Sequence, residues 1–148
     1  MKLKIKPLSE KIGNEIPLPY YATQGAAALD LHACIDDPVD IAPGERVVIP
    51  TGLAVAIPTG YVGIVAVRSS MGIRSGVTLS NGIGVIDSDY RGPLGVGLYN
   101  TGQTPYTVRP GDRVAQLMVT PVVREEIEVV EELPPTRRGD GGFGSTGR

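Results

Sequence analysis

Glycine and proline interrupt this 148-residue chain at short intervals along almost its whole length. The 20 glycines and 13 prolines are spread through the sequence and are not collected in one tract. Proline is excluded from helix interiors and glycine weakens them, so an amphipathic helix of ordinary length has almost no place here. The spacing therefore predicts an all-β fold in one domain, with a single weak helix candidate near Met71.

Short apolar runs lie between these turn signals and predict about eight to eleven short strands. Runs 46–49 and 53–57 flank Pro50-Thr51-Gly52, which predicts a hairpin turn between two strands. In the run from Leu94 to Leu98, glycines occupy one face, which indicates close approach of another backbone or a ligand. Many short strands with frequent turns are typical of a sandwich, jelly roll or barrel. The remaining strand candidates are 29–34, 61–67, 77–79, 83–86, 113–119 and the acid-rich run 122–130.

Composition excludes several kinds of partner and site. Fourteen basic and sixteen acidic residues give a net charge of −2, so we expect no nucleic-acid polymer and no anionic membrane surface as a partner. The single cysteine and single histidine exclude an internal disulfide and a Cys/His zinc cluster, whereas a hard cation held by oxygens stays open. No run is long and apolar enough for a membrane span or signal peptide, and we expect a cytoplasmic protein.

The composition changes after Leu133-Pro134-Pro135, which predicts a domain over residues 1–133 and a flexible, glycine-rich tail over 134–148. The only phenylalanine of the chain, Phe143, lies in this tail. A disordered terminus is one interpretation. The other is a lid, in which glycine N–H groups, Arg138, Ser145 and Thr146 bind phosphate while the aromatic ring stacks on a base.

Two further segments carry polar groups that suit a nucleotide. Arg68-Ser69-Ser70 follows an apolar strand, where it either binds phosphates or caps a helix with its serines. In segment 84–92, Asp87 follows an aliphatic pair, and a carboxylate in such a place can act as a general base. A hairpin turn accounts for the same residues without chemistry. The Asn81 amide matches the edge of a pyrimidine or forms a turn, and Gln116 interrupts an apolar strand.

These segments, in this order, resemble the five motifs of the trimeric dUTP pyrophosphatase (dUTPase) family over nearly the whole chain. Ala28 stands where the family often has glycine, and Val67 stands where proline often precedes the arginine. Neither difference removes a functional group. The five matching segments are 27–31, 68–72, 84–92, 111–117 and 138–147.

The resemblance implies a jelly-roll-like, distorted β-barrel that forms a homotrimer with active sites shared between subunits. It implies hydrolysis of dUTP to dUMP and pyrophosphate with Mg²⁺, which lowers dUTP and supplies dUMP for thymidylate synthesis. Asp87 would activate the attacking water, and Tyr90 would stack under the deoxyribose and exclude a ribose 2′-hydroxyl. Asp30 would meet Mg²⁺ through water, the metal being held mainly by substrate phosphates. The remaining implied substrate-binding residues are Asn81, Val85 and Ile86 for uracil, Phe143 over the base, Gly95 near the sugar, and Arg68, Ser69, Ser70, Gln116, Arg138, Ser145 and Thr146 for phosphates.

Two alternatives remain open from the sequence. A dCTP deaminase is similar in fold and has an Arg-Ser-Ser motif, but its third motif resembles Ile-Asp-x-x-Phe-Glu-Gly where this chain has Tyr90 and Arg91. The glutamate that would assist deamination is therefore absent. A nucleotide-binding module without catalysis would keep the fold, bind dUTP and release no pyrophosphate.

Overall fold

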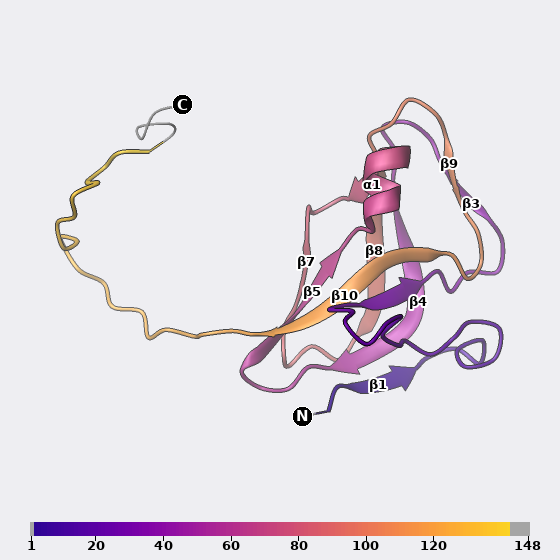
Figure 1. Cartoon of the computed structure of the whole chain (residues 1–148), viewed down its shortest axis with the longest axis horizontal. Coiled ribbons are helices and arrows are strands. Elements are labelled where there is room, and N and C mark those ends of the chain that lie inside the picture. The colour runs from indigo at the N-terminus through magenta and orange to yellow at the C-terminus, as the bar shows by residue number, and fades with distance from the viewer. Residues whose placement is uncertain (1, 143–148) are drawn as a thin grey trace.

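A computed structural model describes residues 2–142 of the chain (Figure 1). The described residues form ten strands and one seven-residue helix, which confirms the predicted all-β fold and the helix near Met71. No helix in this range is long and apolar enough to cross a bilayer. In chain order the elements are β1 (Lys4–Pro7), β2 (Leu29–His32), β3 (Val39–Ile41), β4 (Arg46–Ala56), β5 (Tyr61–Ala66), α1 (Ser69–Ser75), β6 (Val77–Leu79), β7 (Gly84–Ile86), β8 (Pro93–Asn100), β9 (Tyr106–Val108) and β10 (Arg113–Pro121).

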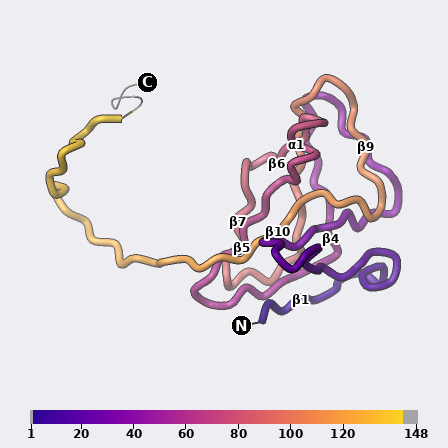
Figure 2. The backbone as a smooth tube through the Cα atoms, viewed as in Figure 1, coloured from indigo at the N-terminus to yellow at the C-terminus, as the bar shows by residue number. Residues whose placement is uncertain are grey.

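The strands form two four-stranded antiparallel sheets and one small two-stranded sheet. The first sheet has the order β1-β4-β8-β6, the second has the order β2-β10-β5-β7, and β3 pairs with β9. Buried aliphatic side chains from both larger sheets, such as Leu98 and Leu117, belong to one hydrophobic core. Figure 2 shows the course of the backbone, with the C-terminal segment leaving the body of the molecule after β10. The arrangement is jelly-roll-like, as expected.

Strand β8 shows how alternating residues build this core. Leu94, Val96 and Leu98 are buried, and the two glycines between them point to the other face. A Cβ added to Gly95 would lie 2.9 Å from Val48 Cγ1, and one added to Gly97 would lie 3.2 Å from Ser80 Oγ. The glycines therefore allow close approach of the Val48 and Ser80 side chains, and Gly95 is itself exposed.

The predicted hairpin at Pro50-Thr51-Gly52 is wrong. Residues 46–56 form the single strand β4, and its pairing with β8 shifts register between Pro50 and Ala54. Gly52 has a φ of 68°, and the buried Thr51 hydroxyl donates to the carbonyl of Leu94 at 2.8 Å. A local irregularity of this kind accommodates a proline inside a sheet, so the chain continues in the same direction where we expected it to reverse.

The acid-rich strand predicted at 122–130 is also absent. The last backbone bond to the barrel runs from Val122 N to the carbonyl of Gly60 at 3.0 Å. Beyond it Ile127 and Val129 are 90% and 93% exposed. A strand requires a neighbour for its ladder of hydrogen bonds, and none of the strands in residues 2–142 lies beside the segment. The alternation of valine, isoleucine and glutamate thus has no partner strand within that part of the chain.

Candidate active site

Four polar side chains meet where β2, β5 and β10 lie side by side. Gln116 on β10 stands opposite Asp30 on β2 and Ala66 on β5. The Asp30 carboxylate receives Arg68 Nε on one oxygen and Arg113 Nη1 on the other, each at 3.2 Å. Gln116 Nε2 donates to the carbonyl of Val67 at 3.3 Å. We call Asp30, Arg68, Arg113 and Gln116 the Asp30 cluster.

Three members of the Asp30 cluster were predicted to bind phosphate or metal, and the structure brings them together. Arg113 was not predicted. It begins β10 opposite His32, and a bulge follows it before Ala115. Its position directly after the Pro-Gly-Asp turn was the available signal, because a basic residue there enters the sheet beside the aspartate strand. Two arginines on one carboxylate leave guanidinium groups that suit an oligophosphate.

His32 lies on the same face of β2 as Asp30, two residues further along the strand. Only 8% of the residue is exposed. Burial lowers the pKa of His32 below its ordinary value, and the charges of Arg113 and Arg68 lower it further, while Asp30 acts in the opposite direction. The imidazole is therefore neutral at pH 7. It adds no positive charge to the Asp30 cluster, and no side-chain nucleophile was expected beside it.

Ser69 and Ser70 form the first two residues of α1. The N-cap of this helix is Arg68, in an extended conformation, so neither serine occupies the capping position. Both serines are exposed, and they follow directly after the arginine of the Asp30 cluster. Their hydroxyls are thus presented at the end of β5, as phosphate binding requires.

The second group of predicted residues lies on the loop between β7 and β8. Asp87 follows β7 and is exposed. Tyr90 N donates to the carbonyl of Asp87 at 3.2 Å, and the Tyr90 hydroxyl donates to the carbonyl of Pro93 at 3.0 Å. A Cβ added to Gly92 would lie 2.7 Å from Tyr90 Cζ, so glycine is required under this ring. The loop contains a turn and also carries an exposed carboxylate, Asp87, and an exposed aromatic side chain, Tyr90.

A cavity of about 430 Å³ opens beside Asp87. Two of the residues predicted to read uracil are exposed. Asn81 lies in the turn before β7, and Val85, on that strand, is 57% exposed. Ile86 is half-buried beside them, and Gly95 lies on β8 two residues beyond Pro93. The residues that line the cavity are Tyr61, Val62, Val85, Asp87, Ser88, Asp89, Val122 and Arg124.

One copy of the chain holds Asp87 and the Asp30 cluster apart. Ile86 pairs with Gly63 in the antiparallel β5–β7 ladder, which sets Asp87 near Val62, at the beginning of β5. Arg68 follows the other end of β5. Six residues of extended chain span about 20 Å. The general-base candidate Asp87 and the arginine predicted to bind phosphate therefore do not meet within a single copy.

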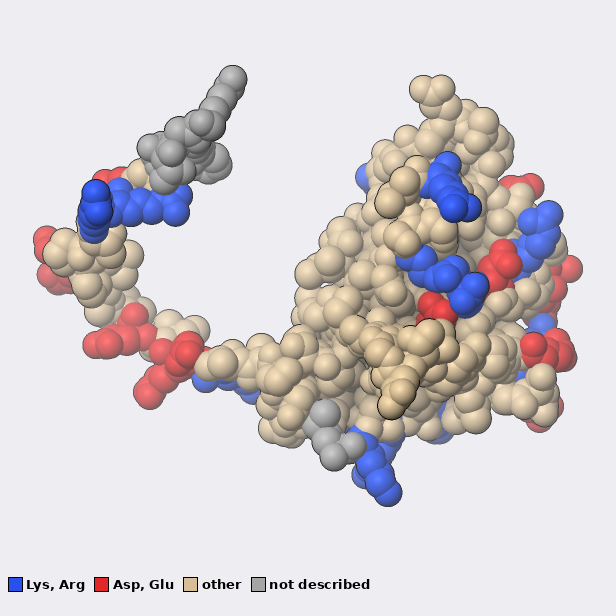
Figure 3. All heavy atoms as spheres, viewed as in Figure 1, with Lys and Arg blue, Asp and Glu red and all other residues tan. Residues whose placement is uncertain are grey.

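The predicted tail residue Arg138 is exposed, and its Nε donates to the carbonyl of Gly141 at 2.7 Å. Residues 122–142 form no strand or helix and run away from the barrel (Figure 1). Figure 3 shows acidic side chains along the first part of this segment and basic ones further on. Phe143, Ser145 and Thr146 lie outside the described residues.

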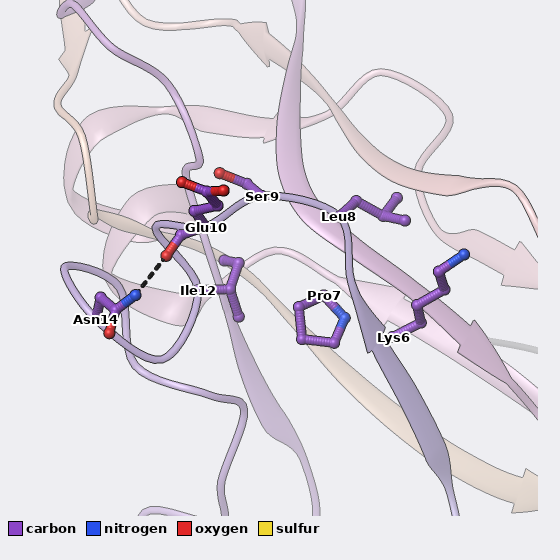
Figure 4. Close-up of a pocket in the computed structure, with 7 residues that line it drawn as sticks. All are labelled: Lys6, Pro7, Leu8, Ser9, Glu10, Ile12 and Asn14. Atoms are coloured by element: carbon purple, nitrogen blue, oxygen red, sulfur yellow. Dashed lines mark hydrogen bonds between the residues drawn. The ribbon is translucent and has the colours of Figure 1, made fainter.

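A second cavity, of about 650 Å³, lies in the N-terminal loop and contains none of the predicted site residues (Figure 4). The Asn14 amide donates to the carbonyl of Glu10 at 2.7 Å across its edge. It is open and its lining mixes apolar and polar side chains without a cluster of charge. The lining residues are Lys6, Pro7, Leu8, Ser9, Glu10, Ile12 and Asn14.

Comparison with solved structures defines the class of this fold. A Staphylococcus bacteriophage 80alpha dUTPase bound to dUpNHpp superposes with a TM-score of 0.88 at 28% identity, covering 99% of each chain. The D-to-N mutant dUTPase of phage phi11 of S. aureus, described as revealing how a structural Mg(II) ion is coordinated, has a TM-score of 0.78 at 26% identity over 89% of this chain and 98% of that one. The structure thus has the jelly-roll-like β fold of the dUTPases.

Sequence comparison defines the family. The dUTPase family profile matches residues 14–147. The deoxyuridine 5′-triphosphate nucleotidohydrolase of Acinetobacter baylyi is 47% identical over 149 residues, covering 100% of this chain and 99% of the relative. The Coxiella burnetii protein of that name is 48% identical, covering 99% and 97%. The chain belongs to the dUTPase family, as the five motifs indicated.

Proposed function

We propose that this protein is a dUTP diphosphatase that hydrolyses dUTP to dUMP and pyrophosphate with Mg²⁺, and that its product supplies dUMP for thymidylate synthesis in the cytoplasm. The proposal rests on the presence of two groups of residues, in separate places, in a chain of the dUTPase family. One is the Asp30 cluster, which offers guanidinium groups to phosphates, and the other is the loop that displays Asp87 beside Tyr90.

In this mechanism Asp87 accepts a proton from a water molecule as the water oxygen forms a bond to the α-phosphorus. The bond between the α-phosphorus and the oxygen bridging to the β-phosphorus breaks, and pyrophosphate leaves with that oxygen. The exposed carboxylate of Asp87 faces a cavity of about 430 Å³, which leaves room for water and a nucleotide. Positioning and charge neutralisation supply most of the stabilisation in such a transfer.

Nucleoside selection falls to the residues around β7. The Asn81 amide and the main chain of Val85 and Ile86 would read the uracil edge, since a side-chain amide and backbone groups together offer both donors and acceptors. The Tyr90 ring would lie under the deoxyribose and leave no room for a 2′-hydroxyl. Gly95, on the first part of β8, would lie near the sugar.

Phosphate binding would combine the barrel and the tail. Arg68, Ser69, Ser70 and Gln116 lie around the end of β5 and would hold the phosphate chain. We propose residues 134–148 as a mobile lid on a domain of residues 1–133. In this lid Phe143 would cover the base, and Arg138, Ser145 and Thr146 would bind the β- and γ-phosphates, which excludes water from the closed site.

The Asp30 cluster fits a magnesium ion that is held mainly by substrate. Among the described residues no group of three or more histidine, cysteine, aspartate or glutamate side chains is arranged to hold a metal. Asp30 already accepts two arginines, and its remaining lone pairs suit a water-mediated contact better than direct ligation. Bound Mg²⁺ would neutralise charge on the phosphates.

The separation of Asp87 from the Asp30 cluster, together with the unpaired C-terminal segment, supports a homotrimer with shared sites. A second copy would bring its Asp87 loop to the Asp30 cluster of the first. Segment 122–130 has the alternation of a strand and exposes its valine and isoleucine side chains, so it would gain a hydrogen-bonding neighbour in another copy.

Pyrophosphate release from dUTP with Mg²⁺ tests this function, measured beside UTP, dCTP and dTTP on the full-length protein. We expect rapid release from dUTP alone. Ammonia release from dCTP would establish the deaminase in its place. Tight binding of dUTP without pyrophosphate release would establish a nucleotide-binding module.

A further inference from the structure

Arg91 makes two contacts that none of the predicted site roles uses. Its Nη1 donates to the carbonyl of Ser88 and to the carbonyl of Tyr90, both at 2.7 Å. Both acceptors belong to the loop that carries Asp87. The Arg91 side chain is exposed, and among the described residues it forms no ion pair with a carboxylate.

The loop has little else to fix its shape. The backbone supplies one bond within it, from Tyr90 N to the carbonyl of Asp87 at 3.2 Å. That bond holds the peptide plane between residues 89 and 90 through its N–H, whereas the carbonyls of Ser88 and Tyr90 belong to the 88–89 and 90–91 peptide planes, which it does not hold. One guanidinium nitrogen that binds the carbonyls of residues 88 and 90 fixes both planes, because a planar, charged donor orients its acceptors.

The same two planes determine where the Tyr90 ring stands. Its hydroxyl reaches the carbonyl of Pro93 at 3.0 Å, and its ring lies against Gly92 so closely that no Cβ fits there. The ring is thus held at its tip by Pro93, along its side by Gly92 and at its backbone by Arg91. Of these three, the contact from Arg91 is the one made by a long side chain at the surface.

We propose that Arg91 is a positioning residue that sets the height of the Tyr90 ring and thereby the discrimination between deoxyribose and ribose. This inference rests on the proposed function and on the place of Tyr90 under the sugar. In the proposed site Arg91 contacts neither the substrate nor the attacking water. Arg91 also lines a cavity of about 310 Å³ with Lys4 and Lys6, and none of the lining residues is a carboxylate, so the loop carbonyls are its acceptors.

The test compares kcat/KM for dUTP with kcat/KM for UTP in wild-type protein, Arg91→Ala and Arg91→Lys. Loss of a charged hydrogen-bond donor is worth about tenfold, so we expect the dUTP/UTP ratio to fall about tenfold in Arg91→Ala. Lysine is a point donor and cannot orient two planes at once, so Arg91→Lys should restore only part of the ratio. Arg109→Ala is the matched control, because Arg109 is also exposed and lies outside the loop.

A double-mutant cycle with Tyr90→Ala separates positioning from general support of the fold. If Arg91 acts through Tyr90, removing Arg91 from the Tyr90→Ala protein leaves the ratio unchanged. An unchanged ratio in Arg91→Ala, or full additivity in the cycle, would overturn the inference while leaving dUTP hydrolysis intact. Wild-type protein that releases no pyrophosphate from dUTP would overturn the proposed function and this inference with it. Melting temperatures of all variants show that each is folded.

Discussion

The barrel and the segment that follows it use apolar residues in opposite ways. In the barrel aliphatic side chains from both larger sheets form a buried core, and within the described residues no buried side-chain polar atom lacks a hydrogen-bond partner. In segment 122–142 all residues except Gly141 are exposed, including Ile127 and Val129. The buried polar side chains of the barrel are hydrogen-bonded, whereas the segment carries strand-forming residues that have no partner strand among the described residues. This difference is what the proposed homotrimer would explain, because a second copy would offer the segment a neighbouring strand.

The largest expected effect is on kcat and comes from a residue of the barrel, Asp87. Asp87→Asn removes the proton acceptor and keeps the shape of the loop, so we expect kcat to fall roughly 10²- to 10⁴-fold. Binding of dUTP should persist, because the Asp30 cluster and Tyr90 are untouched. Single-turnover rates and calorimetric binding of a non-hydrolysable dUTP analogue measure the two quantities. A variant with near-normal kcat would remove Asp87 from its proposed role.

Two substitutions, one in the core and one in segment 122–142, compare how much each region contributes to the free energy of unfolding. Leu98→Ala should lower the free energy of unfolding by about 2–5 kcal/mol, because this fully buried side chain leaves a cavity. Val129→Ala, in the exposed segment, should cost less and should act on subunit dissociation. Urea unfolding at several protein concentrations distinguishes the two. Equal costs that do not depend on concentration would show that the segment packs within its own copy.

Deleting residues 137–148 separates the tail from the barrel. The deletion removes Arg138 and the remaining tail groups proposed to bind phosphates, so we expect kcat/KM to fall roughly 10- to 100-fold. The melting temperature should stay at the wild-type value, since residues 137–142, the described part of the deleted segment, contribute nothing to the core. Arg138→Ala in the full-length chain is the matched control and should show part of the loss. Unchanged turnover after deletion would contradict the lid.

The smallest effect concerns pH and belongs to the barrel alone. Burial, with Arg113 and Arg68, lowers the pKa of His32 below its ordinary value of 6.5. Below that pH the unfolded chain binds more protons than the folded one, so the free energy of unfolding should fall as the pH drops from 6.5 through the folded pKa. His32→Gln should flatten this slope.

Urea unfolding between about pH 5.5 and 7.5 measures the slope in a range where histidine is the side chain that ordinarily titrates. The chain has one histidine, so the comparison of wild type with His32→Gln isolates it. A wild-type slope that survives in His32→Gln would assign the pH dependence to another group.

Much of the fold followed from the sequence because local pattern and burial agree there. Alternation in 94–98 and the turn at Pro110-Gly111 placed β8 and β10, since each short strand has a neighbour in the same chain. The prediction failed at Pro50, where a register shift within β4 absorbed a turn signal. It failed again at 122–130, because strand propensity does not reveal whether a neighbouring strand is present, and the described residues place none beside this segment.

The candidate site was predictable to a similar degree, through its resemblance to the family. The motifs brought Asp30, Arg68 and Gln116 to notice, and the structure places them together. Arg113 was missed because its contact with Asp30 depends on the register between β2 and β10. The two residues are more than 80 positions apart, and a local sequence pattern does not determine such a register. The separation of Asp87 from Arg68 along β5 could be seen only once the β5–β7 pairing was known.

We propose that each active site contains Asp87 from one copy of the chain and Arg68 from another. Asp87→Asn and Arg68→Gln, each nearly inactive alone, are mixed in equal amounts, unfolded and refolded together, and assayed for pyrophosphate release from dUTP. If the two residues come from different copies, about a quarter of the sites regain both wild-type residues, and activity returns in that proportion. Activity no greater than that of the separate variants would show that one copy supplies both residues.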